Sequence, residues 1–176
     1  SQPLRVLDLC AGSGCVGLGT ASLMPGIAVT AVEYSEEALA YLRRNGARYP
    51  ELMVEPVQAD VLRDAGRFPG GWAAILSNPP YIPAADLPGL MREVQREPRL
   101  ALDGGEDGLR FYRAIVRDWV GSAPSRWESA RRSRLRPFSA ERAWKMWKRG
   151  GISAAWNGWS SACGRRFREI TRNIRL

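Results

Sequence analysis

The sequence predicts an α/β fold built on an open, mainly parallel, doubly wound sheet. Three observations predict it. Short apolar runs alternate with stretches whose composition suits helices, the first run leads into a glycine-rich turn, and later runs end in polar side chains. Strands that alternate with helices pair in parallel, and such sheets bind their ligands outside the carboxyl ends of the strands.

The first predicted βα unit opens the chain. Residues 4–9 form a short apolar run, which meets a glycine-rich turn at residues 11–14. The apolar stretch at residues 15–24 that follows suits a helix, and Pro25-Gly26 stops it. The pattern therefore predicts a strand, a loop and a helix in that order.

A second unit follows at once. Residues 27–32 are predicted to form a buried strand, which ends in the acidic residue Glu33. Ser35 is a suitable N-cap for a helix that runs to about Arg48. Two glutamates fall in the first turn of that helix, where the positive end of the helix dipole favours carboxylates.

Two further strands and a helix complete the predicted core. A weaker strand at residues 54–57 ends near Asp60, and a fourth strand at residues 72–77 runs straight into Asn78. Residues 109–120 are predicted to form an amphipathic helix. The apolar positions at helical spacing are Leu109, Tyr112, Ile115, Val116 and Trp119.

The charge is divided unevenly along the chain. Residues 1–120 hold 12 arginines and no lysine against 15 acidic residues, a net charge of −3. Residues 121–176 hold the other 14 basic residues against 3 acidic ones, a net charge of +11, and five of the seven tryptophans. This change in composition predicts a boundary near Gly121.

Composition also narrows the function classes. No stretch approaches the roughly 18 apolar residues of a membrane span, and no basic, apolar and cleavage regions open the chain. The chain has no histidine, and its three cysteines form no CxxC pair, which argues against a zinc site or a histidine-based triad. We therefore expect a soluble, cytoplasmic protein without a metal or a membrane partner.

The first candidate site is the loop Asp8-Leu-Cys-Ala-Gly12-Ser-Gly14, at the end of the first predicted strand. Glycines there let the backbone approach a ligand closely. Gly17 completes the spacing G-x-G-x-x-G, so the pattern alone also allows a dinucleotide. The preceding Asp8 tips the choice, because a carboxylate repels a pyrophosphate but suits the ammonium of a methionine moiety. A tight turn with no ligand is the alternative.

Two more acidic residues mark the same edge of the sheet. Glu33 ends the second predicted strand, and a bidentate carboxylate fits the two vicinal hydroxyls of a ribose. Asp60 follows the third strand, where it could accept a hydrogen bond from an adenine amino group while Val61 packs on the ring. The alternative for Asp60 is an ordinary acid of a surface loop.

The second candidate site is the tetrapeptide Asn78-Pro79-Pro80-Tyr81, after the fourth predicted strand. An amide or aromatic amine nitrogen is a poor nucleophile because its lone pair is delocalised. Fixed acceptors for both of its N–H bonds would aim the lone pair at a methyl group. The Asn78 side-chain oxygen and the Pro79 carbonyl suit that task, since consecutive prolines stiffen the loop. Tyr81 could pack against the planar group. An ordinary Asn-Pro turn is the alternative.

These motifs resemble those of class I methyltransferases that modify planar nitrogens, including the adenine and guanine methyltransferases of nucleic acids. A further segment, Glu-Pro-Arg-Leu-Ala-Leu-Asp-Gly-Gly-Glu-Asp-Gly-Leu at residues 97–109, precedes Phe111-Tyr112. It closely resembles the segment downstream of the tetrapeptide in the HemK/PrmC family, the release-factor glutamine methyltransferases. The resemblance covers about residues 4–120 and implies a Rossmann-like class I methyltransferase sheet.

The resemblance implies S-adenosyl-L-methionine as the cofactor. In that family, Asn78 and Pro79 would hold the glutamine amide of a Gly-Gly-Gln loop, and Glu97 would lie near the active-site wall. The expected cofactor-binding residues are Asp8, Ala11, Gly12, Gly14, Glu33, Tyr34, Asp60, Val61 and Asn78. The expected catalytic residues are Asn78, Pro79, Pro80 and Tyr81, and the substrate-binding residues are Asn78, Pro79, Tyr81 and Glu97.

The implied function is methyl transfer from S-adenosyl-L-methionine to the side-chain amide nitrogen of a protein glutamine, with a peptide chain release factor as partner. Two alternatives stay open. One is methylation of an exocyclic amino group of adenine or guanine in nucleic acid, which the net charge of −3 in residues 1–120 weakens. The other is a cofactor-binding but inactive truncated core, whose basic tail binds nucleic acid non-specifically.

The resemblance stops at both ends of the chain. We expect neither the N-terminal helical domain of that family nor its last strands here. Residues 121–176 contain no run of four or more β-branched or aliphatic residues, so we expect a sheet that is incomplete at its C-terminal strands. Their Arg, Ser, Trp and Gly mixture is typical of GC-rich coding sequence read out of frame. We expect a cofactor-binding core at residues 1–120 and a non-native or disordered tail at residues 121–176.

Overall fold

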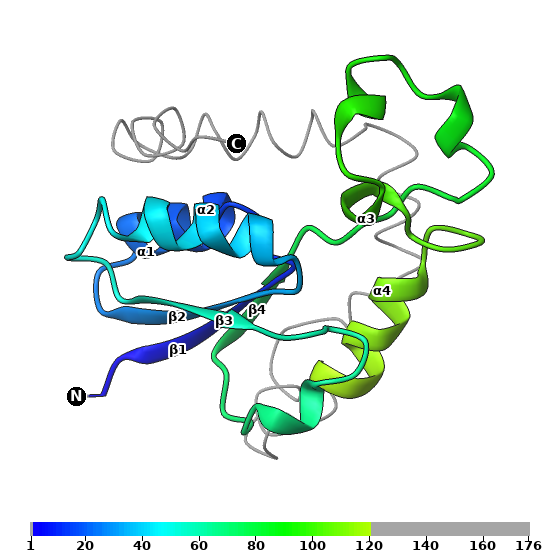
Figure 1. Cartoon of the computed structure of the whole chain (residues 1–176). Helices are drawn as coiled ribbons and strands as arrows, with labels where there is room; N and C mark the ends of the chain where they lie inside the picture. The colour runs from blue at the N-terminus through cyan, green and yellow to red at the C-terminus, as the bar shows by residue number, and fades with distance from the viewer. Residues whose placement is uncertain (1, 121–176) are drawn as a thin grey trace.

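A computed structural model describes residues 2–120 of the chain (Figure 1). At its centre four parallel strands form one sheet, in the order β3-β2-β1-β4. The strands are β1 (Leu4–Leu9), β2 (Ile27–Glu33), β3 (Val54–Gln58) and β4 (Ala74–Ser77). The predicted α/β fold with a parallel sheet is confirmed. The fourth strand begins at Ala74 rather than at Trp72, whose ring lies under the Arg5 guanidinium at 4.0 Å.

The order of the strands reverses between β1 and β4. The chain steps outward from β1 to β2 and β3, then returns to pair β4 with the other side of β1. Leu9 is aligned with Val32 on one side and with Ser77 on the other, so the three strands end level with one another. Open α/β sheets bind ligands in the crevice at such a reversal. The loops after β1 and β4 therefore border the candidate site.

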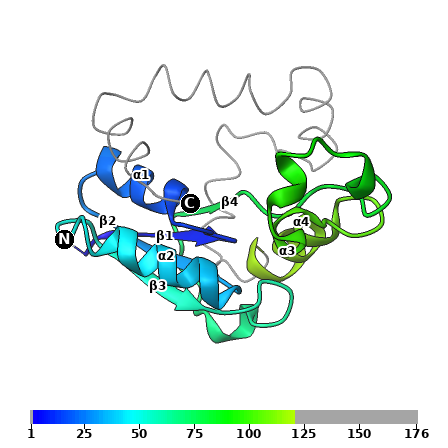
Figure 2. The same ribbon diagram turned by 45° about the horizontal axis from the view of Figure 1, so that its top comes forward.

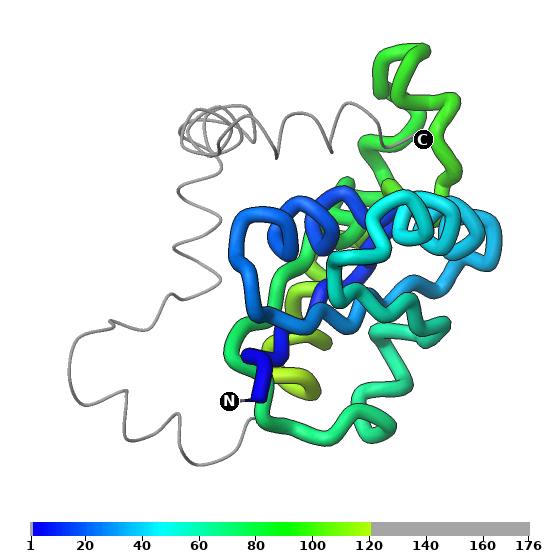
Figure 3. Tube along the Cα trace, turned by 90° about the vertical axis from the view of Figure 1, so that its left-hand side faces the viewer, coloured from blue at the N-terminus to red at the C-terminus, as the bar shows by residue number. Residues whose placement is uncertain are grey.

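Helices α1 (Cys15–Leu23) and α2 (Glu36–Gly46) lie side by side over one face of the sheet (Figures 1 and 3). Both were predicted, and both begin just after the carboxyl end of a strand. The buried apolar residues of this layer are Val6, Ala21, Ile27, Val29, Ala31, Leu39 and Leu42. Burial of this apolar surface, at about 25 cal/mol per Å², holds the two helices against the sheet.

Helix α2 begins as predicted. The Ser35 side-chain oxygen accepts a hydrogen bond from the backbone N–H of Ala38 at 3.3 Å. Glu36 and Glu37 stand in the first turn, where they complement the helix dipole. The helix ends at Gly46, slightly earlier than the sequence pattern indicated.

Beyond the carboxyl ends of the strands, α4 (Arg110–Ala114) continues into the π-helical turn η4 (Ile115–Val120), which packs on the face of the sheet opposite α1 and α2 (Figure 2). Trp119 is 2% exposed and donates from Nε1 to the Val61 carbonyl at 2.8 Å. The ring of Phe68 lies 5.0 Å from the ring of Trp119, centroid to centroid. Ile115 and Trp119 share one buried cluster with Leu7, Leu9, Val32, Ala59 and Val61.

The predicted apolar face of this helix is wrong at two positions. Tyr112 is 36% exposed and Val116 is 58% exposed, while Phe111 packs against the core instead. The sequence pattern assumes the α-helical period, whereas a π-helical turn bonds to the fifth residue along and so turns less per residue. Phe111 of α4 and Ile115 and Trp119 of η4, four residues apart, pack against the same cluster.

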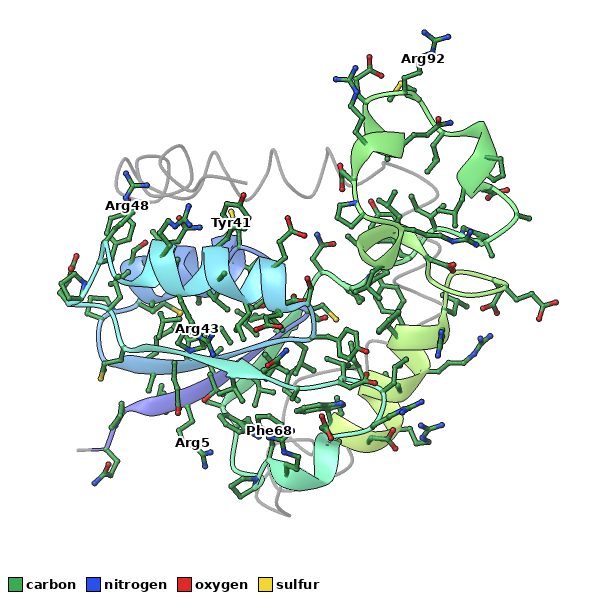
Figure 4. The ribbon with its side chains drawn as sticks, in the orientation of Figure 1. Arg5, Tyr41, Arg43, Arg48, Phe68 and Arg92 are labelled. Carbon is green, nitrogen blue, oxygen red and sulfur yellow. The ribbon has the colours of Figure 1, made fainter. Side chains whose placement is uncertain are left out.

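A segment between β4 and α4 projects beyond the carboxyl edge of the sheet (Figure 1). Figure 4 shows Arg92 at its far end. Gln95 holds it together by donating from Nε2 to the carbonyls of Leu90 at 2.7 Å and Pro88 at 3.1 Å. Its short elements are η2 (Leu87–Gly89), η3 (Val94–Arg96) and α3 (Arg99–Leu102), and a further turn, η1 (Ala65–Arg67), lies between β3 and β4.

The predictions for the basic tail, and for the boundary near Gly121, lie outside the described residues. The prediction that the sheet lacks its C-terminal strands also concerns that part of the chain. Among residues 2–120, every helix is too short or too polar to cross a lipid bilayer.

Candidate active site

The glycine loop and the Asn-Pro-Pro-Tyr loop leave the sheet from adjacent strands. Leu9 ends β1 and Ser77 ends β4, and the two residues are partners in the parallel register. The Ser77 hydroxyl donates to the Leu9 carbonyl at 2.8 Å, which ties the two strand ends together. The residues at 10–14 and 78–81 thus start side by side at the crevice that the strand order creates.

The two predicted loop glycines perform different tasks. Gly12 has φ +56°, and a Cβ built on it would meet no atom within 4 Å. Gly14 has φ +88°, and its Cβ would lie 2.3 Å from the Leu42 side chain of α2. Both need the left-handed backbone that glycine adopts most readily. The open space beside Gly12 can admit a ligand, whereas Gly14 allows the loop to pack on α2.

The third glycine of the pattern packs α1 onto β1. A Cβ at Gly17 would lie 2.9 Å from Asp8 Oδ2 and 3.2 Å from the Val29 side chain. A glycine at this spacing allows close helix–strand packing in dinucleotide-binding loops also. Gly17 therefore serves the fold, and the spacing of the three glycines does not itself identify the ligand.

Glu33 fastens the glycine loop to the end of β2. Its Oε2 accepts from the backbone N–H of Gly12 at 2.8 Å, and its Oε1 accepts from the backbone N–H of Ser35 at 2.8 Å. The residue is only 9% exposed, and the two backbone donors fix the orientation of its carboxylate. Each carboxylate oxygen has a second lone-pair direction. The fixed carboxylate can therefore still accept bonds from two ligand hydroxyls.

Asp8 is a buried carboxylate with an unpaired oxygen. The residue is 1% exposed, and among residues 2–120 its Oδ2 has no hydrogen-bond partner. Burial raises the pKa of Asp8 to about 7, the N–H of Gly17 works against that rise, and the charge of Glu33 adds to it. A buried acceptor without a partner is costly. A nearby ammonium group would favour the charged carboxylate, so the residues present fit the cofactor expected here.

The two predicted residues that follow β3, Asp60 and Val61, lie in different surroundings. The Asp60 carboxylate is partly buried; its Oδ1 accepts from the Leu62 N–H at 2.8 Å, and its Oδ2 lies 3.7 Å from Arg63 Nε. Val61 is 3% exposed and belongs to the buried cluster of Trp119. Most of its side chain therefore faces the core, which leaves little of it for an adenine ring. Tyr34 is 56% exposed, beside Glu33.

The Asn-Pro-Pro-Tyr loop begins with an exposed residue, which two buried prolines follow. Asn78 is exposed, and its side chain makes no hydrogen bond within the part of the chain that the structure describes. Pro79 is fully buried and Pro80 is buried too, so the loop is anchored directly after Asn78. Tyr81 is half-buried. The arrangement leaves the Asn78 amide accessible on an anchored backbone.

Electrostatic effects show which side chains gather around this loop. Burial raises the pKa of Tyr81, and the charge of Glu97 raises it further. Burial likewise raises the pKa of Tyr112, with contributions from Tyr81 and Cys10. Glu97, exposed at the rim, thus lies close enough to Tyr81 for its charge to act on the phenol. The structure also adds Tyr112 of α4 to the site.

The pKa of the Cys10 thiol depends on groups at the ends of several strands. Burial raises the pKa of its thiol to about 12, with further rises from the charges of Glu33, Asp8 and Asp60 and a lowering by a hydrogen bond with Ser77. All three predicted cofactor acids therefore lie near one side chain. Sequence reasoning missed both Cys10 and Tyr112. The position of Cys10 inside the glycine loop was an available signal, but that of Tyr112 depended on how α4 packs.

The family comparison decides the identity of the core. Residues 2–100 match the family model described as the methyltransferase small domain, which covers more than half of the chain. The chain belongs to the methyltransferase small domain family. The glycine loop, Glu33 and the tetrapeptide all fall within the matched part of this methyltransferase domain, whereas Tyr112 lies beyond it.

Curated relatives share the same region of the methyltransferase domain. A release factor glutamine methyltransferase of Geobacter sulfurreducens is 46% identical over 114 residues, which cover 63% of this chain and 38% of the relative. One of the same name from Gloeobacter violaceus is 44% identical over 118 residues, covering 65% and 40%. A ribosomal protein uL3 glutamine methyltransferase of Bradyrhizobium diazoefficiens is 40% identical over 115 residues, covering 65% and 35%. The chain spans about two fifths of the length of these relatives.

A solved structure shows the same fold. The hMettl16 catalytic domain, crystallised in complex with the MAT2A 3'UTR hairpin 6, superposes with a TM-score of 0.50 at 17% identity. The superposition covers 68% of this chain and 46% of that one. At this identity the likeness concerns the fold of the methyltransferase domain alone.

Proposed function

We propose that this chain carries the catalytic core of an enzyme that methylates the side-chain amide nitrogen of a glutamine in a protein. The methyl donor would be S-adenosyl-L-methionine. The observation that carries the proposal is the exposed Asn78 amide on an anchored proline loop, at the strand reversal beside the glycine loop. The names of the relatives, which are glutamine methyltransferases, support the same substrate class.

The residues around the glycine loop would hold the cofactor. Its ammonium would lie toward Asp8, the backbone of Ala11, Gly12 and Gly14 would follow its methionine part, and Glu33 would bind the ribose hydroxyls. Tyr34 and Asp60 would border the adenine, and Asn78 would close the site on the substrate side. When bound, the cofactor supplies a methyl group on a positively charged sulfur. Support comes from the unpaired oxygen of Asp8 and the open space beside Gly12.

The tetrapeptide would prepare the glutamine amide for attack. The Asn78 side-chain oxygen and the Pro79 carbonyl would each accept one N–H of the amide, which turns its lone pair toward the methyl carbon. Pro80 stiffens the loop, and Tyr81 would pack on the amide plane. The nitrogen would gain the methyl group and give up one proton to solvent, and the bound cofactor would supply a neutral sulfide as the leaving group.

No side chain has to act as a general base in this scheme. Holding the two reactants in line can itself contribute up to ~7–11 kcal/mol to the rate. The rigid loop makes such placement possible, because the fully buried Pro79 keeps its position when the substrate moves. The proposed role of the protein is therefore orientation more than proton transfer.

The charges of the site favour a protein over a nucleic acid. Asp8, Glu33 and Asp60 surround Cys10, and Glu97 stands beside Tyr81. Clustered carboxylates repel phosphates, whereas nucleic-acid grooves depend on positive charge. A peptide loop that presents glutamine, such as the Gly-Gly-Gln loop of a release factor, carries no such penalty. Glu97 would border that substrate loop.

A labelled methyl donor tests the proposal directly. The chain is incubated with S-adenosyl-L-methionine labelled in its methyl group and, in separate tubes, with a release factor that carries a Gly-Gly-Gln loop, its Gln→Ala variant, duplex DNA and ribosomal RNA. We expect label on the first protein and on none of the other three. Label on nucleic acid but not on the glutamine would overturn the proposed substrate.

A further inference from the structure

The Asn-Pro-Pro-Tyr loop is backed by a glycine-rich segment that packs directly on its main chain. A Cβ built on Gly104 would lie 2.7 Å from Tyr81 Cα and 2.8 Å from the Tyr81 carbonyl carbon. A Cβ built on Gly108 would lie 2.3 Å from the Tyr81 carbonyl oxygen. Real Cβ atoms essentially never approach so closely, and here the neighbour is backbone rather than a movable side chain.

Hydrogen bonds hold the same two segments in register. Ile82 donates its N–H to the Leu102 carbonyl at 2.9 Å, and Gly104 donates its N–H to the Ile82 carbonyl at 2.9 Å. Ala84 then donates to the Gly105 carbonyl at 2.9 Å. Ile82 and Asp103 form a parallel bridge. The chain after Tyr81 is therefore tied to the glycine segment at Ile82 and Ala84, so a shift of one segment moves the other.

The glycine segment is itself held in shape at both ends. Asp103 Oδ1 accepts from the Gly105 N–H at 2.9 Å, a side-chain turn that sets the first bend. Asp107 Oδ1 accepts from the Leu109 N–H at 3.1 Å and from Arg113 at 2.9 Å, which joins the second bend to α4. The segment can therefore act as a stiff support rather than as a loose loop.

We propose that Gly104 and Gly108 are positioning residues for methyl transfer: their missing side chains let this support close on the Tyr81 main chain and set where the Asn78 and Pro79 acceptors stand. The inference rests on the proposed function of that loop. Neither glycine touches cofactor or substrate. They act through Tyr81, which two rigid prolines join to Asn78; the first of these prolines, Pro79, is the second acceptor.

The size of the effect follows from the contact distances. Ordinary contact begins at 3.4 Å, so relief of a Cβ at 2.3 Å from the Tyr81 oxygen needs a shift of about 1 Å. A misplacement of that size can lower the rate of an oriented reaction by ~10². The cofactor loop is held separately by Glu33 and Ser35, so cofactor binding should not share the loss.

The segment supplies its own matched control. Gly105 has φ +89°, close to the +75° of Gly108, so alanine strains the backbone at both positions. The Cβ at Gly105 would face the Arg110 side chain at 3.1 Å instead of Tyr81. Gly104 is not in the left-handed region, so Gly104→Ala adds contacts with the Tyr81 backbone and with Gly108 Cα, at 2.8 Å, without that strain. Three alanine variants thus separate displacement of Tyr81 from destabilisation of the segment.

The experiment measures kcat and KM for a Gly-Gly-Gln protein substrate, the Kd of S-adenosyl-L-methionine by calorimetry, and Tm, for the full chain and the three variants. We expect kcat to fall by ~10² in Gly104→Ala and Gly108→Ala, with the Kd within about twofold of the parent value. Gly105→Ala should keep kcat within about threefold although its strained backbone lowers its Tm. A kcat loss in Gly105→Ala as large as in the other two variants, or a Kd that weakens along with kcat, would overturn the inference.

A second readout separates this inference from the proposed function. Hydrogen exchange at the Ile82 and Ala84 amides should speed up in Gly104→Ala and Gly108→Ala but stay near the parent rate in Gly105→Ala. If the parent chain methylates no glutamine, the proposed function fails while the exchange rates still decide whether the two glycines hold Tyr81 in place. Unchanged exchange in all variants would show that they do not.

Discussion

Glu33 accepts a hydrogen bond from the backbone N–H of Gly12 at 2.8 Å and so joins the end of β2 to the glycine loop. A second bond from the Ser35 N–H holds the other carboxylate oxygen. One side chain thus shapes the loop and presents the acceptors that the proposed ribose would use. Substitution of Glu33 should therefore weaken binding of the cofactor more than binding of the protein substrate.

We predict that Glu33→Ala weakens S-adenosyl-L-methionine binding by ~1.5–3 kcal/mol, the range for a hydrogen bond to a charged group. The affinity of Glu33→Gln should lie between those of the parent and Glu33→Ala, because glutamine keeps one acceptor oxygen. Calorimetry measures the affinities. Glu55→Ala, which removes an exposed carboxylate from β3, is the control and should bind as the parent does. Equal affinity in Glu33→Ala and the parent would remove Glu33 from the site.

The Asn78 amide should matter for turnover and not for the cofactor. Replacing it with alanine removes one acceptor for the amide hydrogens of the substrate, so we expect methyl transfer to fall by ~10²–10³. Single-turnover assays with labelled cofactor measure the rate, and calorimetry checks that cofactor affinity survives. Gln58→Ala removes an exposed amide at the end of β3 and serves as the control. A comparable loss in both variants would contradict a special role for Asn78.

Asp8 should make the stability of the chain depend on pH near neutrality. Its pKa is about 7 in the folded chain against an ordinary value of 3.8 for an aspartate, so between these values the folded state binds the extra proton. Stability therefore falls as the pH rises, and the loss levels off above about pH 7. From pH 5 to pH 8 we expect a decrease of about 2–3 kcal/mol from this residue.

Urea unfolding at both pH values, in the parent and in Asp8→Asn, measures the effect. The asparagine cannot ionise, so its curve should lack that part of the pH dependence. A saturating concentration of S-adenosyl-L-methionine should also reduce the slope in the parent, since an ammonium group near Asp8 favours its charged form. Identical slopes in the parent and in Asp8→Asn would mean that Asp8 does not titrate in this range.

Removal of residues 122–176 tests the division of the chain. The deleted part carries all of the +11 charge of residues 121–176, so the full chain should bind DNA or RNA with a strong salt dependence that the shortened chain lacks. Cofactor affinity should be nearly unchanged. Filter binding at several salt concentrations and calorimetry measure the two properties. If the deletion unfolds residues 4–120, the predicted boundary is wrong.

Local pattern was sufficient for most of the fold. The four strands, the Ser35 cap and the places where the strands end are all readable from short stretches, because side-chain periodicity and turn chemistry act between near neighbours. The helix at residues 109–120 shows the limit of that reasoning. Its buried face depends on a π-helical turn and on the fit of Trp119 beneath the sheet, neither of which the α-helical period encodes.

The sequence by itself determined which polar and glycine residues meet at the carboxyl edge, since parallel strands bring their ends together. Only the tertiary structure decided what each of them does there. Gly12 borders open space while Gly14 packs on Leu42, and Val61 turns into the core beneath Trp119. Tyr112 joins Tyr81 and Cys10 from a distant part of the chain. Burial and electrostatic environment depend on long-range packing, and they set both the space left for a ligand and the pKa of Asp8.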